Sequence, residues 1–148
     1  MSPEDSGALR DVVDRYADAV DRRDEEALIA LFADDGVLKV QGDDGPVENE
    51  WTGRDVVRSF EVLAGFHRTF HHVGGCVFEA TGPNGATGRV KCLAHHYERT
   101  GNGPVDLVMM INYHDTYRRD DRWRIAERRV AIEWTELHPA HPRRKVKR

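Results

Sequence analysis

The spacing of hydrophobic and polar positions changes once along the chain, from a helical period near the start to an alternating period in the second half. Residues 8 to 23 place apolar side chains three or four positions apart, which predicts one buried stripe on an amphipathic helix. Asp21 lies at the edge of that stripe. A second, shorter helix is predicted over 24–33, where Asp24 is a suitable N-cap residue and acidic residues fill the first turn.

A small hairpin and a third helix are predicted next. The segments "VLKVQ" and "VENEW" flank the turn "GDDGP", a pattern typical of two paired strands. Thr52 and Asp55 resemble a capping box ahead of a helix that would bury Val56, Val57, Phe60 and Leu63 and end at Gly65.

The remaining chain alternates and predicts four long strands, over 70–81, 87–100, 104–119 and 122–134. Short turns rich in Gly, Asn and Asp join them, and such turns favour antiparallel neighbours. Helices that precede a run of strands indicate an α+β fold, in which a pocket can form between the sheet and its helical cover.

Length and charge limit the classes of protein that remain. The 148 residues suffice for one core, so we expect a single domain over 1–137 and a basic tail over 138–148. The net charge of -4 is spread over interspersed signs, which argues against binding to nucleic acid. The tail is interpreted as a solvated terminus in preference to a polyanion-binding segment. Its basic residues are Arg143, Arg144, Lys145, Lys147 and Arg148.

The two cysteines and the hydropathy of the chain bear on its location. Cys76 and Cys92 lie in apolar, strand-like surroundings without metal-ligand spacing, as expected for reduced core thiols. No leader-like segment opens the sequence and no apolar run reaches the length of a membrane span. We therefore expect a cytoplasmic protein that does not bind membranes.

Strict alternation sorts the candidate polar residues into faces but does not tell which face lines a pocket. Arg128 is the one charged residue on an otherwise apolar face of the last strand, so it is expected to point inward or into an interface. Two adjacent histidine pairs, 71–72 and 95–96, each put one ring on either face, and this choice stays open. Alternation groups His71 with Val73 and Val77, His72 with Cys76 and Phe78, His95 with Leu93 and Tyr97, His96 with Cys92 and Ala94, and Arg128 with Val130, Ile132 and Trp134.

From about residue 8 to residue 135, the chain resembles a known family. The stretches "YADAVDRRDEEALIALFADDGVL", "HHVGG", "LAHHY" and "YRRDDRWRIAERRVAIEW" are similar to the SnoaL-like, scytalone-dehydratase-like branch of the NTF2-like superfamily. The resemblance implies an NTF2-like cone: three N-terminal helices packed on a strongly curved, mostly antiparallel sheet that encloses a pocket. It also implies a homo-oligomer, dimer or trimer, formed through the convex face of the sheet.

The same resemblance implies the site. Asp21 and His71 match a catalytic dyad, His95 and Asn112 match substrate-binding positions, and Arg128 matches an arginine of the dehydrochlorinase relatives. Two family tyrosines and a serine are replaced by valines and a methionine, so Tyr16 is a further candidate for binding a substrate oxygen. The expected apolar lining is Val20, Val40, Phe60, Leu63, Leu93 and Met110.

These residues suit proton abstraction next to a carbonyl, because a histidine oriented by a carboxylate is a general base near neutral pH. We expect a lyase of the dehydratase type or an isomerase that acts without metal or organic cofactor on a small, largely apolar metabolite, polyketide- or steroid-like. One alternative is a non-catalytic small-molecule-binding or assembly module. Another is a polyketide cyclase or an epoxide-opening enzyme, the latter disfavoured because Asp106 and Asp115 have the wrong parity to share the face of Asn112.

Each candidate also has a structural interpretation. Asp21 could cap a helix, His71 could be a backbone-bonded strand histidine, and Arg128 could pair with Glu79 or Glu98 across the sheet. A zinc site of His71, His95 and Asp21 is disfavoured, because their spacing follows no known ligand pattern.

Overall fold

A computed structural model of the chain describes residues 1–42 and 45–144, and it contains helices packed on one six-stranded sheet. The elements are α1 (Pro3–Arg22), α2 (Glu25–Leu31), β1 (Phe32–Gly42), β2 (Val47–Thr52), a 3₁₀ helix η1 (Gly53–Arg58), α3 (Ser59–Val62), β3 (Arg68–Gly82), β4 (Gly85–Thr100), β5 (Gly103–Arg119) and β6 (Trp123–Pro139).

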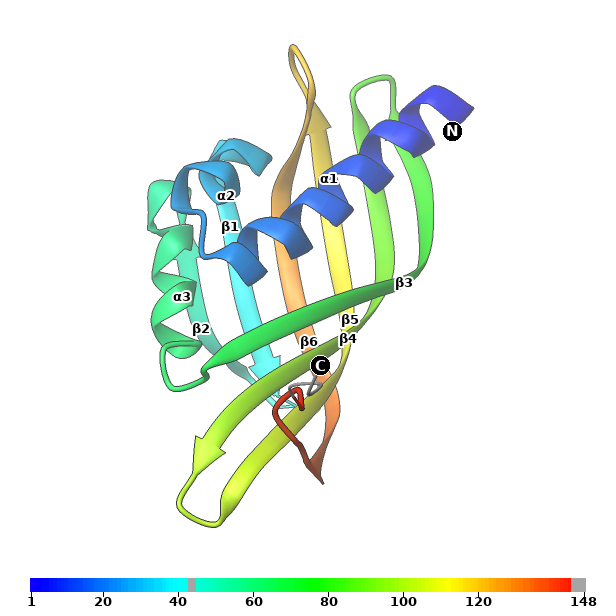
Figure 1. Cartoon of the computed structure of the whole chain (residues 1–148). Coiled ribbons are helices and arrows are strands. Elements are labelled where there is room, and N and C mark those ends of the chain that lie inside the picture. The colour runs from blue at the N-terminus through cyan, green and yellow to red at the C-terminus, as the bar shows by residue number, and fades with distance from the viewer. Residues whose placement is uncertain (43–44, 145–148) are drawn as a thin grey trace.

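The sheet is mostly antiparallel and strongly bent. Its strand order is β2-β1-β6-β5-β4-β3, and β1 and β6 form the parallel pair. Helix α1 lies diagonally across one face, which we call the concave face, and α2 and α3 lie near β1 and β2 (Figure 1). The predicted α+β cone with its curved, mostly antiparallel sheet is confirmed.

Helix α1 forms and packs as its sequence pattern predicts. The Ser2 side chain accepts a hydrogen bond from the Asp5 backbone N–H at 3.0 Å and caps the helix, and Pro3 occupies the first position, where it blocks no helical bond. The apolar stripe is buried against the sheet: Leu9, Val12, Val13, Tyr16, Ala17, Ala19 and Val20. The stripe therefore fixes which side of α1 faces the strands, and it thereby sets the position of Asp21 relative to them.

The third helix differs from its prediction. Residues 53–58 form a 3₁₀ helix followed by a single α-turn, and Thr52 makes no side-chain capping bond, so the expected capping box is wrong. Gly53, the first residue of this segment, turns the chain with φ of 62°, and within the segment Val56 alone is fully buried. With one buried anchor, a regular amphipathic helix gains little from packing. The turn predicted over 42–46 includes residues 43 and 44, which lie outside the described residues.

A bulge at Gly74 and Gly75 reverses the faces of β3. The register with β4 shifts between Val73 and Cys76, so the two glycines together lie opposite a single residue of the neighbouring strand. His71 and Val73 consequently share the concave face with Cys76 and Phe78, whereas Val77 is 51% exposed on the opposite, convex face. The predicted grouping of His71 with Val77 is wrong, because alternation holds only on either side of a bulge.

A second bulge, at Glu133, does the same in β6. Ile132 pairs with Ile111 on the concave face, but Trp134 pairs with Met110 and is 57% exposed on the convex face. The predicted common face of Arg128 and Trp134 therefore ends at Ile132.

The end of the chain is described in part. Strand β6 continues to Pro139, and the expected boundary between domain and tail at 137/138 stays a prediction. Of the tail's basic residues, Lys145, Lys147 and Arg148 lie outside the described residues. Within the described residues, no helix combines the length and the apolar character that crossing a membrane requires.

A pair of glycine substitutions tests how closely β1 approaches β6. A Cβ atom on Gly36 would lie 2.9 Å from the carbonyl oxygens of Ala33 and Ile125, whereas one on Gly75 would meet nothing within 4 Å. We expect Gly36→Ala to lower the free energy of unfolding by about 1–3 kcal/mol, because backbone must move, and Gly75→Ala to change it by less than about 0.5 kcal/mol. Denaturant unfolding measures both, and equal losses would contradict the close approach.

Candidate active site

Asp21, at the end of α1, and His71, near the start of β3, form the predicted pair. The Asp21 Oδ1 atom lies 2.7 Å from His71 Nδ1, and Oδ2 accepts the His71 backbone N–H at 2.9 Å. Two bonds to one residue fix both the position of the carboxylate and the plane of the imidazole. The predicted neighbours are thus in hydrogen-bond contact, on the concave face.

The partner of Nδ1 determines the tautomer of His71. An ionised carboxylate only accepts hydrogen bonds, so Nδ1 carries the proton and Nε2 keeps its lone pair. Burial would raise the pKa of Asp21, but hydrogen bonds from the His71 ring and backbone outweigh it, and the pKa is lowered. The carboxylate is therefore ionised near neutral pH. The His71 side chain is 7% exposed, so the ring is largely enclosed.

His96 joins this site, and His95 does not. The buried ring of His96 lies 4.8 Å from the ring of Phe66 and 5.9 Å from that of His71, centroid to centroid. Its Nδ1 donates to the Leu107 carbonyl at 2.9 Å, which leaves the lone pair on Nε2. Burial lowers the pKa of His96, with a smaller contribution from His71. Two imidazole rings thus lie edge to face on the concave side.

The structure places two predicted substrate-binding residues on the convex face. His95 Nδ1 pairs with Asp106 Oδ2 at 2.7 Å there, and the Asn112 side chain donates to Glu133 at 3.0 Å. Neither residue shares a face with His71, which corrects their expected placement. The residues of the alternative zinc site likewise do not converge. His95 and His96 are adjacent in the sequence, and only the orientation of β4 in the sheet decides which of the two rings lies on the concave face.

Arg128 and Tyr16 lie in the core beneath α1. Arg128 is 0% exposed and donates from Nε and Nη2 to the two oxygens of Asp115 at 2.9 and 2.7 Å. Its guanidinium lies between the rings of Tyr16 and Tyr113, 4.3 and 4.0 Å from their centroids. Among the described residues, Nη1 of Arg128 is the one buried side-chain nitrogen or oxygen without a hydrogen-bond partner.

Asp115 is therefore the partner of Arg128, in place of Glu79 or Glu98. Asp115 and Asn112 do have opposite parity, as predicted, but Asn112 is the residue that points outward. The prediction is wrong for Asp106, which has the same parity as Asn112 and lies with it on the convex face. Burial alone would lower the pKa of Arg128, and the Asp115 carboxylate reverses this, so the pKa is raised well above its ordinary value. An epoxide-opening enzyme would need an inward carboxylate paired with an arginine. Asp115 and Arg128 form such a pair, but both side chains are 0% exposed.

The expected apolar lining divides between the two faces. Val20 is buried in the core, and Val40, Phe60 and Leu63 pack against it in partly buried positions. Leu93 and Met110 instead line a cavity of about 540 Å³ on the convex face, together with His72 and Trp134. Partly buried apolar side chains at the edge of the core therefore remain on the dyad's side.

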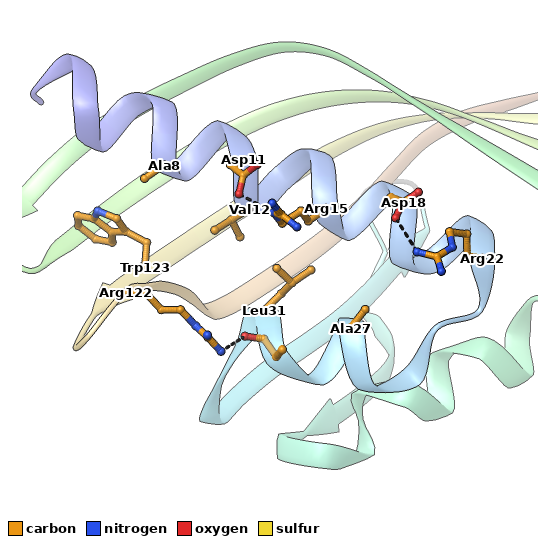
Figure 2. Close-up of a pocket in the computed structure, with 11 residues that line it drawn as sticks. Ala8, Asp11, Val12, Arg15, Asp18, Arg22, Ala27, Leu31, Arg122 and Trp123 are labelled. Carbon is orange, nitrogen blue, oxygen red and sulfur yellow. Dashed lines mark hydrogen bonds and ion pairs between the residues drawn. The ribbon is translucent and has the colours of Figure 1, made fainter.

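Asp21 and His71 line neither this convex cavity nor a second cavity formed by described residues. The other one, of about 440 Å³, lies between α1, α2 and the residues before β6 (Figure 2). Four of its charged groups are paired, Arg15 with Asp11 at 2.6 Å and Arg22 with Asp18 at 3.3 Å. The fifth, Arg122, donates a hydrogen bond to the Ala30 carbonyl at 3.2 Å.

Comparison with known proteins identifies the family. Residues 2–129 match the SnoaL-like domain, and the chain belongs to this family, which confirms the predicted resemblance. No curated protein matches the chain.

Solved structures share the fold. A Novosphingobium aromaticivorans protein provisionally assigned as a scytalone dehydratase is 23% identical, with a TM-score of 0.73 over 93% of this chain and 89% of that one. The hexachlorocyclohexane dehydrochlorinase LinA-type3 of Novosphingobium barchaimii is 18% identical, with a TM-score of 0.78 over 93% and 94%. A Mycobacterium tuberculosis protein of unknown function is 25% identical, with a TM-score of 0.67 over 88% and 75%.

The buried His96 makes stability depend on pH. Its pKa is lowered from 6.5 in the folded chain, so the unfolded chain binds the proton more tightly. The neutral ring's contribution is complete from about one pH unit above 6.5, and it is lost as the pH falls through 6.5 toward the lower pKa of the folded chain. We expect the free energy of unfolding to fall between about pH 7.5 and 5, by up to ~1.4 kcal/mol for each unit of pKa shift.

Urea unfolding of wild type and His96→Gln over this range measures the contribution of that ring. The difference between the two curves should shrink on acidification, and parallel curves would show that His96 does not titrate differently in the folded chain.

Proposed function

We propose that this chain is a cofactor-independent lyase of the dehydratase type or an isomerase, in which His71 is the general base and Asp21 orients it. One observation carries the proposal: Asp21 holds the Nδ1 proton of His71 at 2.7 Å, which leaves the Nε2 lone pair available on the concave face. Among the described residues, no hydrogen bond occupies that Nε2. A base of this kind accelerates proton transfer by about 10²–10⁴-fold.

The proposed reaction conserves protons. His71 Nε2 takes the proton from the carbon next to the substrate carbonyl, and the electron pair of that C–H bond moves toward the carbonyl oxygen. Asp21 stabilises the resulting imidazolium. In an elimination the electrons return to form the C=C bond, the C–O bond to the leaving hydroxyl breaks, and the imidazolium returns its proton to release water. In an isomerisation the proton returns to another carbon.

The substrate-binding part of the proposal changes with the geometry. His96 takes the place proposed for His95, because its neutral Nε2 can accept a hydrogen bond from a substrate hydroxyl. Arg128 remains a candidate for binding an oxygen through Nη1, its donor without a partner. Tyr16 lies over the same guanidinium and would act with it. Both require a rearrangement of the enclosed core, since the structure leaves Arg128 0% exposed.

The substrate class follows from the lining and from the relatives. Val40, Phe60 and Leu63 are partly buried apolar residues on the dyad's side, which suits a small, largely apolar carbonyl compound, polyketide- or steroid-like. The names of two relatives, a dehydratase and a dehydrochlorinase, both denote eliminations. This favours elimination over the alternatives of cyclisation, epoxide opening and binding without chemistry.

A chromogenic elimination tests the base directly. A nitrobenzisoxazole loses its ring proton to a general base and opens to a coloured phenolate, so it needs no knowledge of the natural substrate. We expect wild type to exceed the buffer rate, and His71→Ala and Asp21→Asn each to lower kcat/KM by at least about tenfold.

The chain provides its own matched control for this test. His95 and Asp106 repeat the 2.7 Å geometry on the convex face, so His95→Ala removes an equivalent pair outside the proposed site. Its rate should stay within about twofold of wild type. If wild type is no faster than His71→Ala, His71 does not act as a general base, and the alternative of a binding module without chemistry is favoured.

We also propose that two or three copies associate through the convex face. His72, Leu93, Met110 and Trp134 are paired neighbours across β3, β4, β5 and β6, and they form an apolar row beside the opposite charges of Lys91 and Glu133. The chain exposes 9124 Å², whereas a monomer of its mass exposes about 7,700 Å². The excess of roughly 1,400 Å² is above the ~800 Å² that one partner buries in a standard interface and lies in the range of larger, obligate interfaces.

Light scattering after gel filtration tests this association. Wild type should elute with the mass of a dimer or trimer, and Leu93→Glu or Trp134→Glu should yield monomers, because each buries a charge in the apolar row. Arg99→Glu, an exposed change near the end of β4, is the control. A monomeric wild type at tens of micromolar would contradict the proposal.

We propose a cytoplasmic location because of the state of the two cysteines. Cys76 and Cys92 are both free thiols, and free thiols persist where the compartment is reducing.

A further inference from the structure

Asp21 has a third hydrogen-bond partner that is not part of the dyad. The Thr69 hydroxyl lies 3.0 Å from Asp21 Oδ1, the oxygen that also holds His71 Nδ1. Thr69 lies two residues before His71 on β3, so both side chains point to the concave face. The carboxylate is therefore held by one donor on Oδ2 and two on Oδ1.

Arg23 donates a hydrogen bond to this threonine. Its Nη1 donates to Thr69 Oγ1 at 2.8 Å and also contacts the carbonyl oxygen of Val20 at the end of α1. A guanidinium carries donors only, so Thr69 Oγ1 must accept this bond. The single hydroxyl proton of Thr69 is then free for Asp21. The direction of the chain of bonds is fixed from Arg23 to Thr69 to Asp21.

The backbone of Arg23 is unusual. It is the one non-glycine residue among those described with a positive φ, 55°, and it forms the C-cap of α1. Glycine is the common residue at such a left-handed helix end, because any side chain there costs conformational energy. The end of α1 places the Arg23 side chain beside Thr69. A requirement for an arginine side chain there would explain why this strained backbone position is not a glycine.

We propose that Thr69 and Arg23 are positioning residues of the dyad: Arg23 aims the Thr69 hydroxyl at Asp21, and this holds the carboxylate in the orientation that places His71. The inference deepens the proposed function and rests on it. Neither residue touches the substrate. They act through Asp21, and they hold it without adding a second negative charge to the site.

Kinetics with the nitrobenzisoxazole separates positioning from binding. We expect Thr69→Val to lower kcat about tenfold with KM changed less than about twofold, and Thr69→Ser to restore most of the rate because it keeps the hydroxyl. Arg23→Gly should lower kcat by severalfold while leaving the melting temperature equal or higher, because glycine accepts φ of 55°. Arg22→Ala, next in sequence but paired with Asp18, should match wild type.

The double variant tests the order of the chain. If Arg23 acts only through Thr69, adding Arg23→Gly to Thr69→Val lowers kcat no further. Losses that multiply would show that Arg23 acts on the dyad by another route and would overturn the proposed sequence of contacts.

A readout without a substrate keeps this inference separate from the proposed reaction. The Nδ1 proton of His71 should give an exchange-protected imidazole signal in proton NMR of wild type, weaker or absent in Thr69→Val and retained in Thr69→Ser. If His71→Ala leaves the elimination unchanged but this pattern holds, the proposed reaction fails and the positioning role stands. If the signal is the same in Thr69→Val and wild type, Thr69 does not position the dyad.

Discussion

The fold depends on one buried ion pair, between Arg128 of β6 and Asp115 of β5. Both side chains are fully enclosed, two hydrogen bonds join them, and Tyr16 of α1 packs over the guanidinium. Removing one partner of such a pair leaves an uncompensated buried charge, which costs about 3–5 kcal/mol. The pair thus fixes α1 on the sheet at one point, and the position of the helix end, where Asp21 lies, follows from it.

The dyad shows how a helix end and a strand start can build a site with few residues. Asp21 contacts the backbone as well as the ring of His71, so the carboxylate orients the imidazole relative to the strand that carries it. The convex face carries a pair of almost the same geometry in His95 and Asp106, where Asp106 also accepts the backbone N–H of His96. Geometry alone therefore does not define a candidate site. Enclosure by α1 and an apolar surround distinguish the two pairs.

The sequence predicts the elements well and their faces less well. The helical stripe of α1, the four long strands and the contact of Asp21 with His71 are all found where expected. The errors in grouping residues along one strand arise at bulges. An extra residue at 74–75 or at 133 is invisible to an alternation count, yet it exchanges the two faces of the strand beyond it. The choice of His96 over His95 depends on which face of the sheet the helices cover, and no local sequence pattern records this.

The glycine pair in β3 has a consequence for how the chain can vary. The bulge lets one strand present His71 and Phe78 to the same face although they are an odd number of residues apart. Deleting one glycine would restore simple alternation and would still leave both the histidine and the phenylalanine on the concave face, whereas deleting both would turn one of them outward. The site end and the core end of β3 are therefore linked by the parity of the chain length between them, so this position can lose one residue more readily than it can lose two.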